Sequence, residues 1–205
     1  LRKVPGVFAR DEEGLGLRPN LGIRGLNPTR SSKVLLLEDG IPIAYAPYGD
    51  NATYYHPPVE RFERIEVLKG SGQIAYGPHT VGAVINYITP PVPGDRAGRL
   101  VASFGNKDFR EIHGQVGDTF GQTGFIAHGT YKETDGAREN MHFEVGDINL
   151  KAVHELSEQQ AVTVRASYYD ETSQVTYSGL TLAEWPADPY QNPFRNDEME
   201  AQRFG

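Results

Sequence analysis

The side chains best suited to binding chemistry lie in one stretch, residues 44–58, which reads AYAPYGDNATYYHPP. Its tyrosines stand among polar residues, namely Tyr45, Tyr48, Tyr54 and Tyr55 beside Asp50, Asn51 and His56. Tyrosine combines a rigid apolar ring with a hydroxyl that donates and accepts hydrogen bonds, which suits recognition surfaces. The stretch is long and aromatic for a routine connection. We therefore predict a recognition loop; the alternative is a tyrosine-rich loop that only packs on its neighbours.

No catalytic or metal-binding constellation accompanies this loop. His56 and Glu60 invite interpretation as a metal pair, but Pro57 and Pro58 between them prevent the helix that would aim both side chains at one ion. Serine, histidine and aspartate occur without a nucleophile context such as GxSxG. We therefore predict no metal site, no cofactor and no enzymatic activity.

The element around which the chain is organised spans residues 60–89, ERFERIEVLKGSGQIAYGPHTVGAVINYIT. Apolar residues among charged ones at 64–69 predict a half-buried strand, and residues 83–88 predict a second strand that stops at Thr89-Pro90-Pro91. The glycines between them do not form a phosphate-binding loop, because Gly77 is followed by Pro78-His79. A dinucleotide fingerprint also fails, since Ala75 stands where its third glycine belongs.

Shorter elements precede this unit. Residues 21–25 predict a strand that ends at Arg24-Gly25, and Asn27-Pro28 favours a turn. Residues 34–37 form an apolar run typical of a buried strand, and Asp39-Gly40 predicts a tight turn before residues 41–43.

Composition narrows the class of protein. The chain has 205 residues with 23 Gly and 14 Pro, which favours short strands over long helices. A net charge of −7 argues against a general nucleic-acid binder. There is no cysteine, so disulfides and cysteine metal sites are excluded. The chain begins without an initiator Met or a signal peptide, and we expect it to be an internal fragment.

After the proline-rich hinge at residues 90–94 the pattern becomes alternating. Apolar and polar residues alternate over 99–104, 111–116, 125–132, 147–152 and 162–169. Strands of about ten residues cross a bilayer when tilted. A polar face suited to a wet lumen and aromatic residues near strand ends favour a membrane barrel over a soluble β-sandwich. The connections 119–123 and 155–160 are short, 134–142 and 173–200 are longer, and 105–108 is a short exception.

Three motifs in order, IRG at 23–25, LLEDGIP at 36–42 and IEVLKGSGQIAYGPHTVGAVINYIT at 65–89, resemble the plug of TonB-dependent outer-membrane receptors. The resemblance implies a small mixed α/β plug at residues 1–93, with its N-terminus missing, followed at 94–205 by the first five or so antiparallel strands of a large transmembrane β-barrel. Residues 1–10 resemble the end of a plug helix and the turn after it.

The same resemblance implies the function. Such receptors sit in the bacterial outer membrane and import a scarce nutrient, usually a ferric chelate, with energy from the inner-membrane TonB complex. The segment that contacts TonB would lie outside this chain. The other implied partner is outer-membrane lipid, and no nucleic acid is expected. Alternatives are a receptor for another siderophore, haem or nutrient, or a soluble β-rich binding module.

Two sets of site residues follow from the resemblance. Residues 25–49, GLNPTRSSKVLLLEDGIPIAYAPYG, are similar to ferric citrate receptors, which implies ferric citrate or a related ferric carboxylate as the ligand. The predicted ligand-binding residues are Tyr45, Tyr48, Asn51 and His79. The predicted plug–barrel contacts are Arg24, Glu66 and Lys69; the alternative is that the cations are merely solvated ends of strands.

Overall fold

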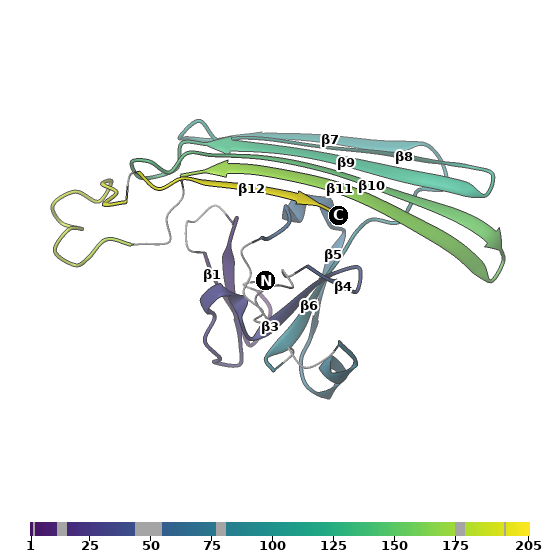
Figure 1. The fold of residues 1–205 in the computed structure, drawn as a ribbon, viewed down its shortest axis with the longest axis horizontal. Helices are drawn as coiled ribbons and strands as arrows, with labels where there is room; N and C mark the ends of the chain where they lie inside the picture. The colour runs from purple at the N-terminus through teal and green to yellow at the C-terminus, as the bar shows by residue number, and fades with distance from the viewer. Residues whose placement is uncertain (2, 12–15, 44–54, 77–80, 175–178, 195) are drawn as a thin grey trace. The chain divides into compact units, whose positions relative to one another are not determined.

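The computed structural model describes all residues except 2, 12–15, 44–54, 77–80, 175–178 and 195 (Figure 1). The chain divides into two compact units, Leu1–Pro90 and Pro91–Gly205. Among the described residues, no helix is both long and apolar enough to cross a membrane.

Unit 1 is built on a four-stranded sheet with the order β4-β3-β6-β5. The strands are β3 (Val34–Glu38), β4 (Ile41–Pro42), β5 (Arg64–Leu68) and β6 (Ala83–Ile88). β3 and β6 pair in parallel, and β5 is antiparallel to β6. Asp39 and Gly40 join β3 to β4 with positive φ angles of 46° and 85°, as a two-residue hairpin turn requires. These strands and this turn confirm the sequence predictions.

The central strands of unit 1 are buried on both faces. Leu35, Leu37 and Val84 form the apolar cluster on one face, against which Leu68 packs. The larger cluster on the other face contains Leu21, Ile23, Val34, Leu36, Ile43, Ala83, Ile85 and Tyr87. Burial on both sides explains why β3 and β6 appear in the sequence as nearly unbroken apolar runs.

A separate hairpin covers the larger cluster. It consists of β1 (Val7–Asp11) and β2 (Pro19–Ile23), which pair antiparallel. The prediction of a helix end within residues 1–10 is therefore wrong: residues 3–6 form turns, and the strand begins at Val7. The strand is favoured because Val7 and Ala9 pack on the buried cluster while their backbone pairs with β2.

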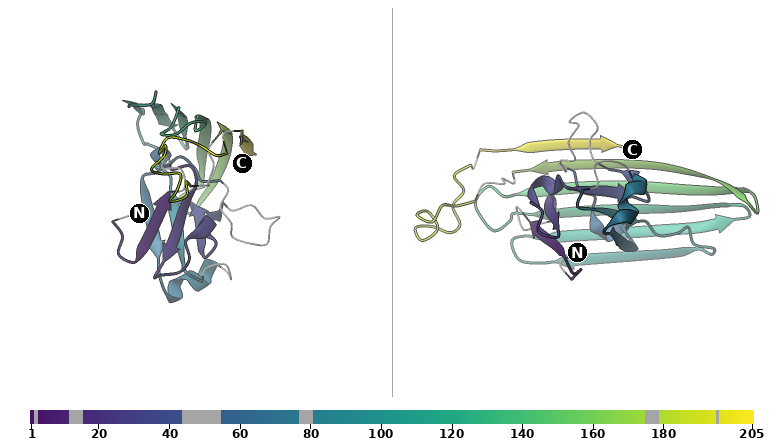
Figure 2. Two further views of the ribbon diagram at one scale, coloured as in Figure 1. Left: turned by 90° about the vertical axis from the view of Figure 1, so that its left-hand side faces the viewer. Right: turned by 90° about the horizontal axis from the view of Figure 1, so that it is seen from below.

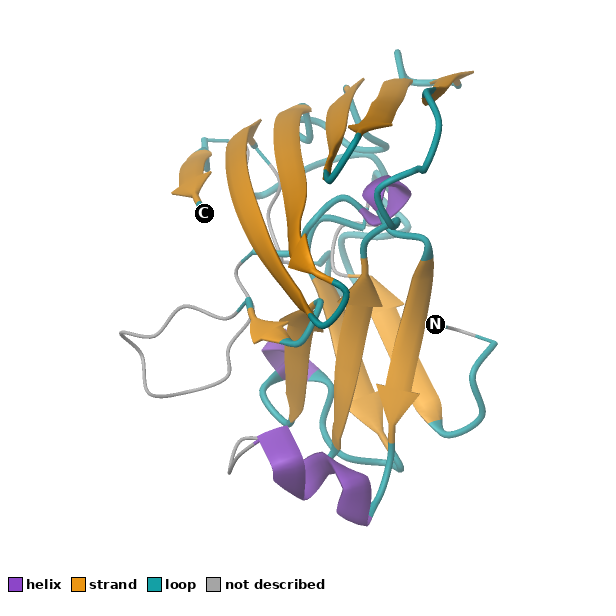
Figure 3. Cartoon of the chain, turned by 90° about the vertical axis from the view of Figure 1, so that its right-hand side faces the viewer, coloured by secondary structure: helices purple, strands orange, loops and turns teal. Residues whose placement is uncertain are grey.

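The described helical segments of unit 1 are 3₁₀ helices: η1 (Thr29–Ser31), η3 (Val59–Arg61) and η4 (Ser71–Tyr76), drawn in purple in Figure 3. The helical part of the predicted mixed plug is thus limited, within the described residues, to these short turns. Glycine and proline are frequent in the residues next to these helices, and both disfavour a helix interior, which explains why the helices stay short.

Unit 2 contains one six-stranded antiparallel sheet in sequence order, seen with its strands side by side in Figure 2. The strands are β7 (Ala97–Phe104), β8 (Arg110–Phe120), β9 (Thr123–Thr134), β10 (Phe143–Ser157), β11 (Gln160–Ser173) and β12 (Met199–Phe204). The first five confirm the predicted strands. β12 was not predicted, because the alternation of Met199 and Ala201 with Glu200 and Gln202 is broken by Arg203 after only four residues.

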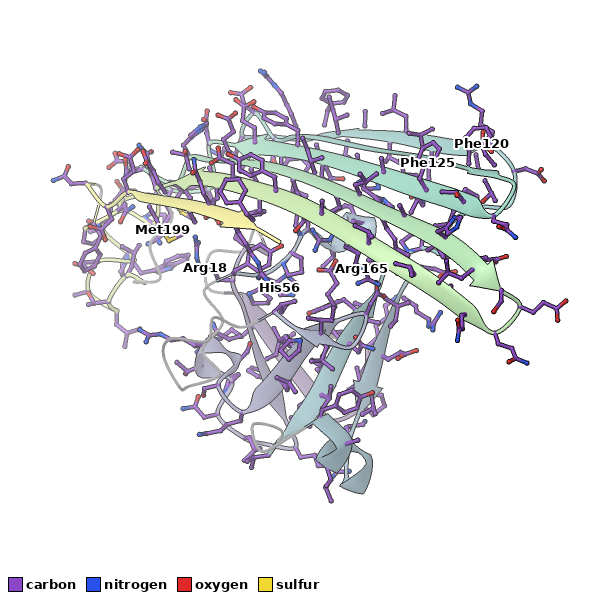
Figure 4. All side chains as sticks on the ribbon, turned by 45° about the vertical axis from the view of Figure 1, so that its right-hand side comes forward. Arg18, His56, Phe120, Phe125, Arg165 and Met199 are labelled. Atoms are coloured by element: carbon purple, nitrogen blue, oxygen red, sulfur yellow. The ribbon has the colours of Figure 1, made fainter. Side chains whose placement is uncertain are left out.

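The two faces of this sheet differ in chemistry. One face exposes large apolar side chains: Leu100, Phe104, Ile112, Val116, Phe120, Ile148, Leu150, Val164 and Phe204. On the other face, His113, His128, Thr130, Asp147 and Glu171 are buried polar residues. Near one end of the sheet, Phe120 and Phe125 stack with ring centroids 6.2 Å apart (Figure 4). The alternation seen in the sequence therefore separates an apolar surface from a polar one.

Candidate functional site

The predicted ligand-binding residues Tyr45, Tyr48, Asn51 and His79 lie outside the described residues, so their role stays a prediction. The residues that flank the first three are described. Ile43 belongs to the larger apolar cluster, and its backbone N–H donates to Leu36 at 3.1 Å. On the other side, Tyr55 and His56 are buried. The predicted recognition loop is thus anchored at both ends in the interior of unit 1.

Arg24 lies directly after β2 in an unusual backbone conformation. Its φ is 53°, and its N–H donates to the Gly6 carbonyl at 2.9 Å. A left-handed conformation costs a non-glycine residue of order 1 kcal/mol or more, so the surrounding structure must hold it. The side chain is exposed and makes no ion pair with the residues the structure describes. Arg24 is therefore a fixed position that presents a guanidinium away from its own unit's core.

Glu66 is the centre of a polar network on β5. One carboxylate oxygen accepts from Arg64 at 3.0–3.1 Å, and the other accepts from the Asn86 side-chain amide at 3.4 Å. The Asn86 carbonyl oxygen in turn accepts the N–H of Gly40 at 2.9 Å. Glu66 thus connects the edge strand to the β3–β4 turn.

Lys69 follows β5 and reaches back to the start of the chain. Its ammonium donates to the Pro5 carbonyl at 2.7 Å, and both groups are exposed. These contacts of Arg24, Glu66 and Lys69 all lie within unit 1, so they do not test the predicted plug–barrel role of the three residues.

Sequence reasoning missed a buried ion pair between Glu38 of the LLEDGIP motif and Arg61. The Arg61 guanidinium contacts the Glu38 carboxylate, with only 3% of the Arg61 side chain and 19% of the Glu38 side chain exposed. Arg61 also lies 5.1 Å over the Phe62 ring. The one sequence signal was a charged residue directly after the apolar run of β3, which requires a partner when buried.

Asp39, next to Glu38, connects the end of β3 to Thr89, the residue that follows β6. Its carboxylate accepts the Thr89 N–H at 2.9 Å and the Thr89 hydroxyl at 2.5 Å. Its own N–H donates to the Tyr87 carbonyl at 2.9 Å. The LLEDGIP motif and the end of the INYIT segment are therefore joined by a continuous set of polar contacts.

Among the described residues of unit 1, Tyr87 has the largest fully buried side chain. Its hydroxyl lies 2.6 Å from His56 Nε2, and its ring stacks on Phe62 with centroids 5.0 Å apart. Burial raises the pKa of the Tyr87 phenol well above its usual range. His56 is thus part of a buried aromatic contact.

Tyr87→Phe in the full-length protein is expected to destabilise unit 1 by about 1–3 kcal/mol near pH 8, because a buried hydrogen-bond partner is lost. A folded-state pKa raised above the unfolded value gives stability that is complete below the unfolded pKa, about 10, and is lost as pH rises above it. The difference between wild type and variant should therefore shrink above pH 10. Urea unfolding at pH 8 and pH 11, monitored by protease cleavage of unit 1, measures this difference in unfolding free energy. A difference that is the same at both pH values would contradict the link between stability and ionisation of Tyr87.

The polar face of the six-stranded sheet also holds interacting side chains. His113 Nδ1 lies 2.9 Å from the Thr130 hydroxyl, and the His113 and His128 rings stack with centroids 6.0 Å apart. Glu171 accepts hydrogen bonds from Tyr169 and Ser173, both at 2.7 Å. Among the described residues, no group of three His, Asp or Glu side chains converges to hold a metal ion. This face therefore carries hydrogen bonds and ring contacts between polar side chains.

Comparison with known proteins finds a family match for most of unit 1 and relatives for a larger part of the chain. Residues 1–84 match the TonB-dependent receptor plug domain. Two curated relatives, the vitamin B12 transporters BtuB of Photobacterium profundum and Vibrio vulnificus, are each 32% identical, over 61% and 66% of this chain. The chain spans only 20% and 22% of their lengths.

Solved structures agree on the fold. The unliganded ferric citrate transporter FecA superposes on 94% of this chain with a TM-score of 0.81 and 29% identity, over 31% of its own length. The pyoverdine receptor FpvA of Pseudomonas aeruginosa superposes on 83% of this chain, and 24% of its own, with a TM-score of 0.68 at 21% identity.

Proposed function

Since this chain belongs to the TonB-dependent receptors of the Gram-negative outer membrane, we propose that it supplies the plug and the first barrel strands of an importer of ferric chelates. The observation that carries the proposal is the succession of a plug unit and a sheet with one apolar and one polar face. The proposed energy source is the inner-membrane TonB complex. No bond of the substrate is made or broken.

The apolar face of the sheet is the proposed contact with outer-membrane lipid. Its apolar band runs between two aromatic rows, one with Phe120 and Phe125 and the other with Phe104, Tyr131, Tyr168 and Phe204. Phe104 pairs with Arg110, which lies ten residues before Phe120 on β8. Ten residues at ~3.3 Å each span about 33 Å, or about 25 Å across the membrane for a tilt of ~40°. That height matches the apolar band of outer-membrane barrels.

On β8 to β12 the same face becomes polar at the register of Phe104, because Phe104 pairs with Arg110 and Arg110 pairs with Glu133. Glu133, Glu144, Thr172 and Glu200 are cross-strand neighbours on β9 to β12. A change from aromatic to carboxylate side chains along one face supports a membrane boundary at that level. The long connections after β9 and β11 leave from this end, which we assign to the cell exterior.

The plug must be held in a polar lumen and still be released, which favours polar contacts over an apolar seal. We propose Arg24 and Lys69 as the cations that contact barrel carboxylates, with Glu66 in the same network. Two observations support this assignment: the backbone of Arg24 is held by its hydrogen bond to Gly6, and the side chain is exposed. Lys69 is partly engaged already, through the Pro5 carbonyl.

Arg24→Ala combined with Lys69→Ala in the full-length receptor is expected to reduce transport severalfold while leaving barrel insertion intact. Because exposed ion pairs contribute about 0–1 kcal/mol each, the plug should loosen rather than unfold. Hydrogen exchange of the plug amides and uptake of the chelate measure the two effects. If both remain at wild-type values, these cations are merely solvated.

The proposed substrate is ferric citrate or a related ferric carboxylate. Such a complex is anionic with its metal already coordinated, so the protein supplies donors to its outer oxygens rather than metal ligands. Tyr45, Tyr48, Asn51 and His79 are the proposed donors, and the similarity of residues 25–49 to ferric citrate receptors supports them. Asp50 opposes an anion at this place, which keeps hydroxamate chelates and haem open as alternatives. Vitamin B12 is a further alternative, because the two curated relatives transport it.

Binding to the purified full-length receptor tests the substrate class. Ferric citrate is expected to bind more tightly than a neutral ferric hydroxamate, haem or cyanocobalamin. Alanine at Tyr48 should weaken ferric citrate binding by roughly 10- to 150-fold, since a hydrogen bond to a charged group contributes roughly 1.5–3 kcal/mol. Tight binding of a competitor without measurable ferric citrate affinity would end the citrate assignment and leave the family assignment standing.

A further inference from the structure

The connection between β11 and β12 presents an unusual apolar surface (Figure 1, yellow). Its large apolar side chains are Leu182, Trp185, Tyr190 and Phe194. The exposed fractions of these residues are 96%, 62%, 62% and 44%, respectively. We call these four residues the loop patch. Exposed aromatic groups gathered in one loop indicate an interaction surface more often than a solvated segment.

Local hydrogen bonds fix the segment that carries Trp185. The Thr181 N–H and hydroxyl donate to Glu184 Oε2 at 2.7 and 2.8 Å, and the Trp185 N–H donates to the Thr181 carbonyl at 3.1 Å. Asp188 then accepts the Tyr190 N–H at 2.8 Å. Each acidic side chain thereby holds the backbone next to an exposed aromatic ring.

A second set of bonds ties the loop to the connection between β9 and β10. The Glu139 N–H donates to the Tyr190 carbonyl at 2.8 Å. The Asn192 side-chain amide, almost fully buried, donates to the Asn140 carbonyl at 3.1 Å, and the Asn140 amide donates to the Asp197 carbonyl at 3.2 Å. The loop patch is therefore held outward by bonds on both of its sides, which lowers the entropic cost of binding.

The net negative charge of the residues around the loop patch favours a positively charged partner. Residues 179–198 carry four acidic side chains, Glu184, Asp188, Asp197 and Glu198, against one basic side chain, Arg195, which gives the segment a net charge of −3. The backbone hydrogen bond from Thr181, followed by that from its hydroxyl, lowers the pKa of Glu184, so this carboxylate is ionised at neutral pH. A cation already approaches one ring of the patch, since Lys107 Nζ lies 5.7 Å from the Tyr190 centroid.

We propose that the loop patch is a docking surface for a basic polypeptide. Lysine or arginine side chains of the partner stack on Trp185 and Tyr190 while the neighbouring carboxylates, Glu184 and Asp188, attract them. The same carboxylates repel an anionic chelate, so this surface is distinct from the proposed substrate site. The proposal rests on the assigned orientation, in which this loop faces the cell exterior.

The test uses the full-length receptor in lipid nanodiscs and, as probe, a fluorescent decapeptide of alternating arginine and glycine. The wild type is expected to bind it, and Trp185→Ala with Tyr190→Ala to weaken binding about tenfold, because two exposed cation–π contacts are lost. Trp185→Phe with Tyr190→Phe keeps both rings and should stay within about threefold of the wild type. Raising the salt concentration should weaken binding of the peptide to all forms.

Three outcomes would overturn the proposal. They are no binding of the peptide, equal binding by the alanine variant and the wild type, and ring-dependent binding of a neutral oligosaccharide in place of the peptide. Ferric citrate uptake, measured in parallel, should persist in the alanine variant. Loss of uptake with unchanged peptide binding would assign the loop patch to the chelate instead.

Discussion

Replacing Arg61 with methionine in the full-length receptor is expected to destabilise the plug by about 3–5 kcal/mol, the largest effect expected in this unit. The guanidinium is almost fully buried against Glu38, and its removal leaves a carboxylate with little access to water. We expect the lower end of this range, because 19% of the Glu38 side chain is exposed and water can partly solvate its charge once Arg61 is removed. Hydrogen exchange of the amides of β3 and β6 reports the loss.

Arg64→Met is the matched control. Arg64 also pairs with a glutamate, Glu66, but both side chains are substantially exposed, at 59% and 41%. Its loss should cost at most about 1 kcal/mol. A double variant, Arg61→Met with Glu38→Leu, should recover part of the stability because no unpaired charge remains. Equal effects of Arg61→Met and Arg64→Met would show that burial of the Glu38–Arg61 pair does not matter.

The second large effect is expected on the apolar face of the sheet. Leu150 lies in the middle of β10, is exposed, and pairs with Ala127 and Ala166. Leu150→Arg is expected to destabilise the folded barrel by about 2–4 kcal/mol, the cost of a cation near the centre of the bilayer. Reversible folding of the full-length receptor into vesicles, followed in urea, measures the change.

Thr163→Arg provides the comparison for this prediction. Thr163 is also exposed, but it lies on the opposite face of β11, between Val162 and Val164. An arginine there faces the polar side and should change stability by less than about 1 kcal/mol. If both variants lose the same stability, the apolar face is not in contact with lipid.

Local sequence patterns were sufficient to predict most of the strands and the hairpin turn that build both units. The bounds of β6 coincide with the predicted 83–88, because an apolar run ends at a threonine and two prolines. The Asp39-Gly40 turn was predictable because its conformation requires positive φ at both positions. The first five strands of the sheet followed from alternation alone.

Contacts between distant residues could not be predicted in this way. Arg61 and Glu38 are 23 residues apart, and His56 and Tyr87 are 31 apart, so no local period connects them. β1 was missed because five residues are too few to show a period, and its pairing with β2 decides its conformation. The substrate site remains a prediction for a different reason, since its four residues lie outside the described part of the chain.

Energised import of a ferric chelate through a plugged barrel can be measured in cells that carry the full-length protein as their one receptor of this type. Radiolabelled ferric citrate is supplied with and without a functional TonB complex, and surface binding and internal iron are determined separately. We expect equal binding in both strains and internal iron only where TonB is functional. Equal accumulation of internal iron in both strains would refute energised import by this receptor.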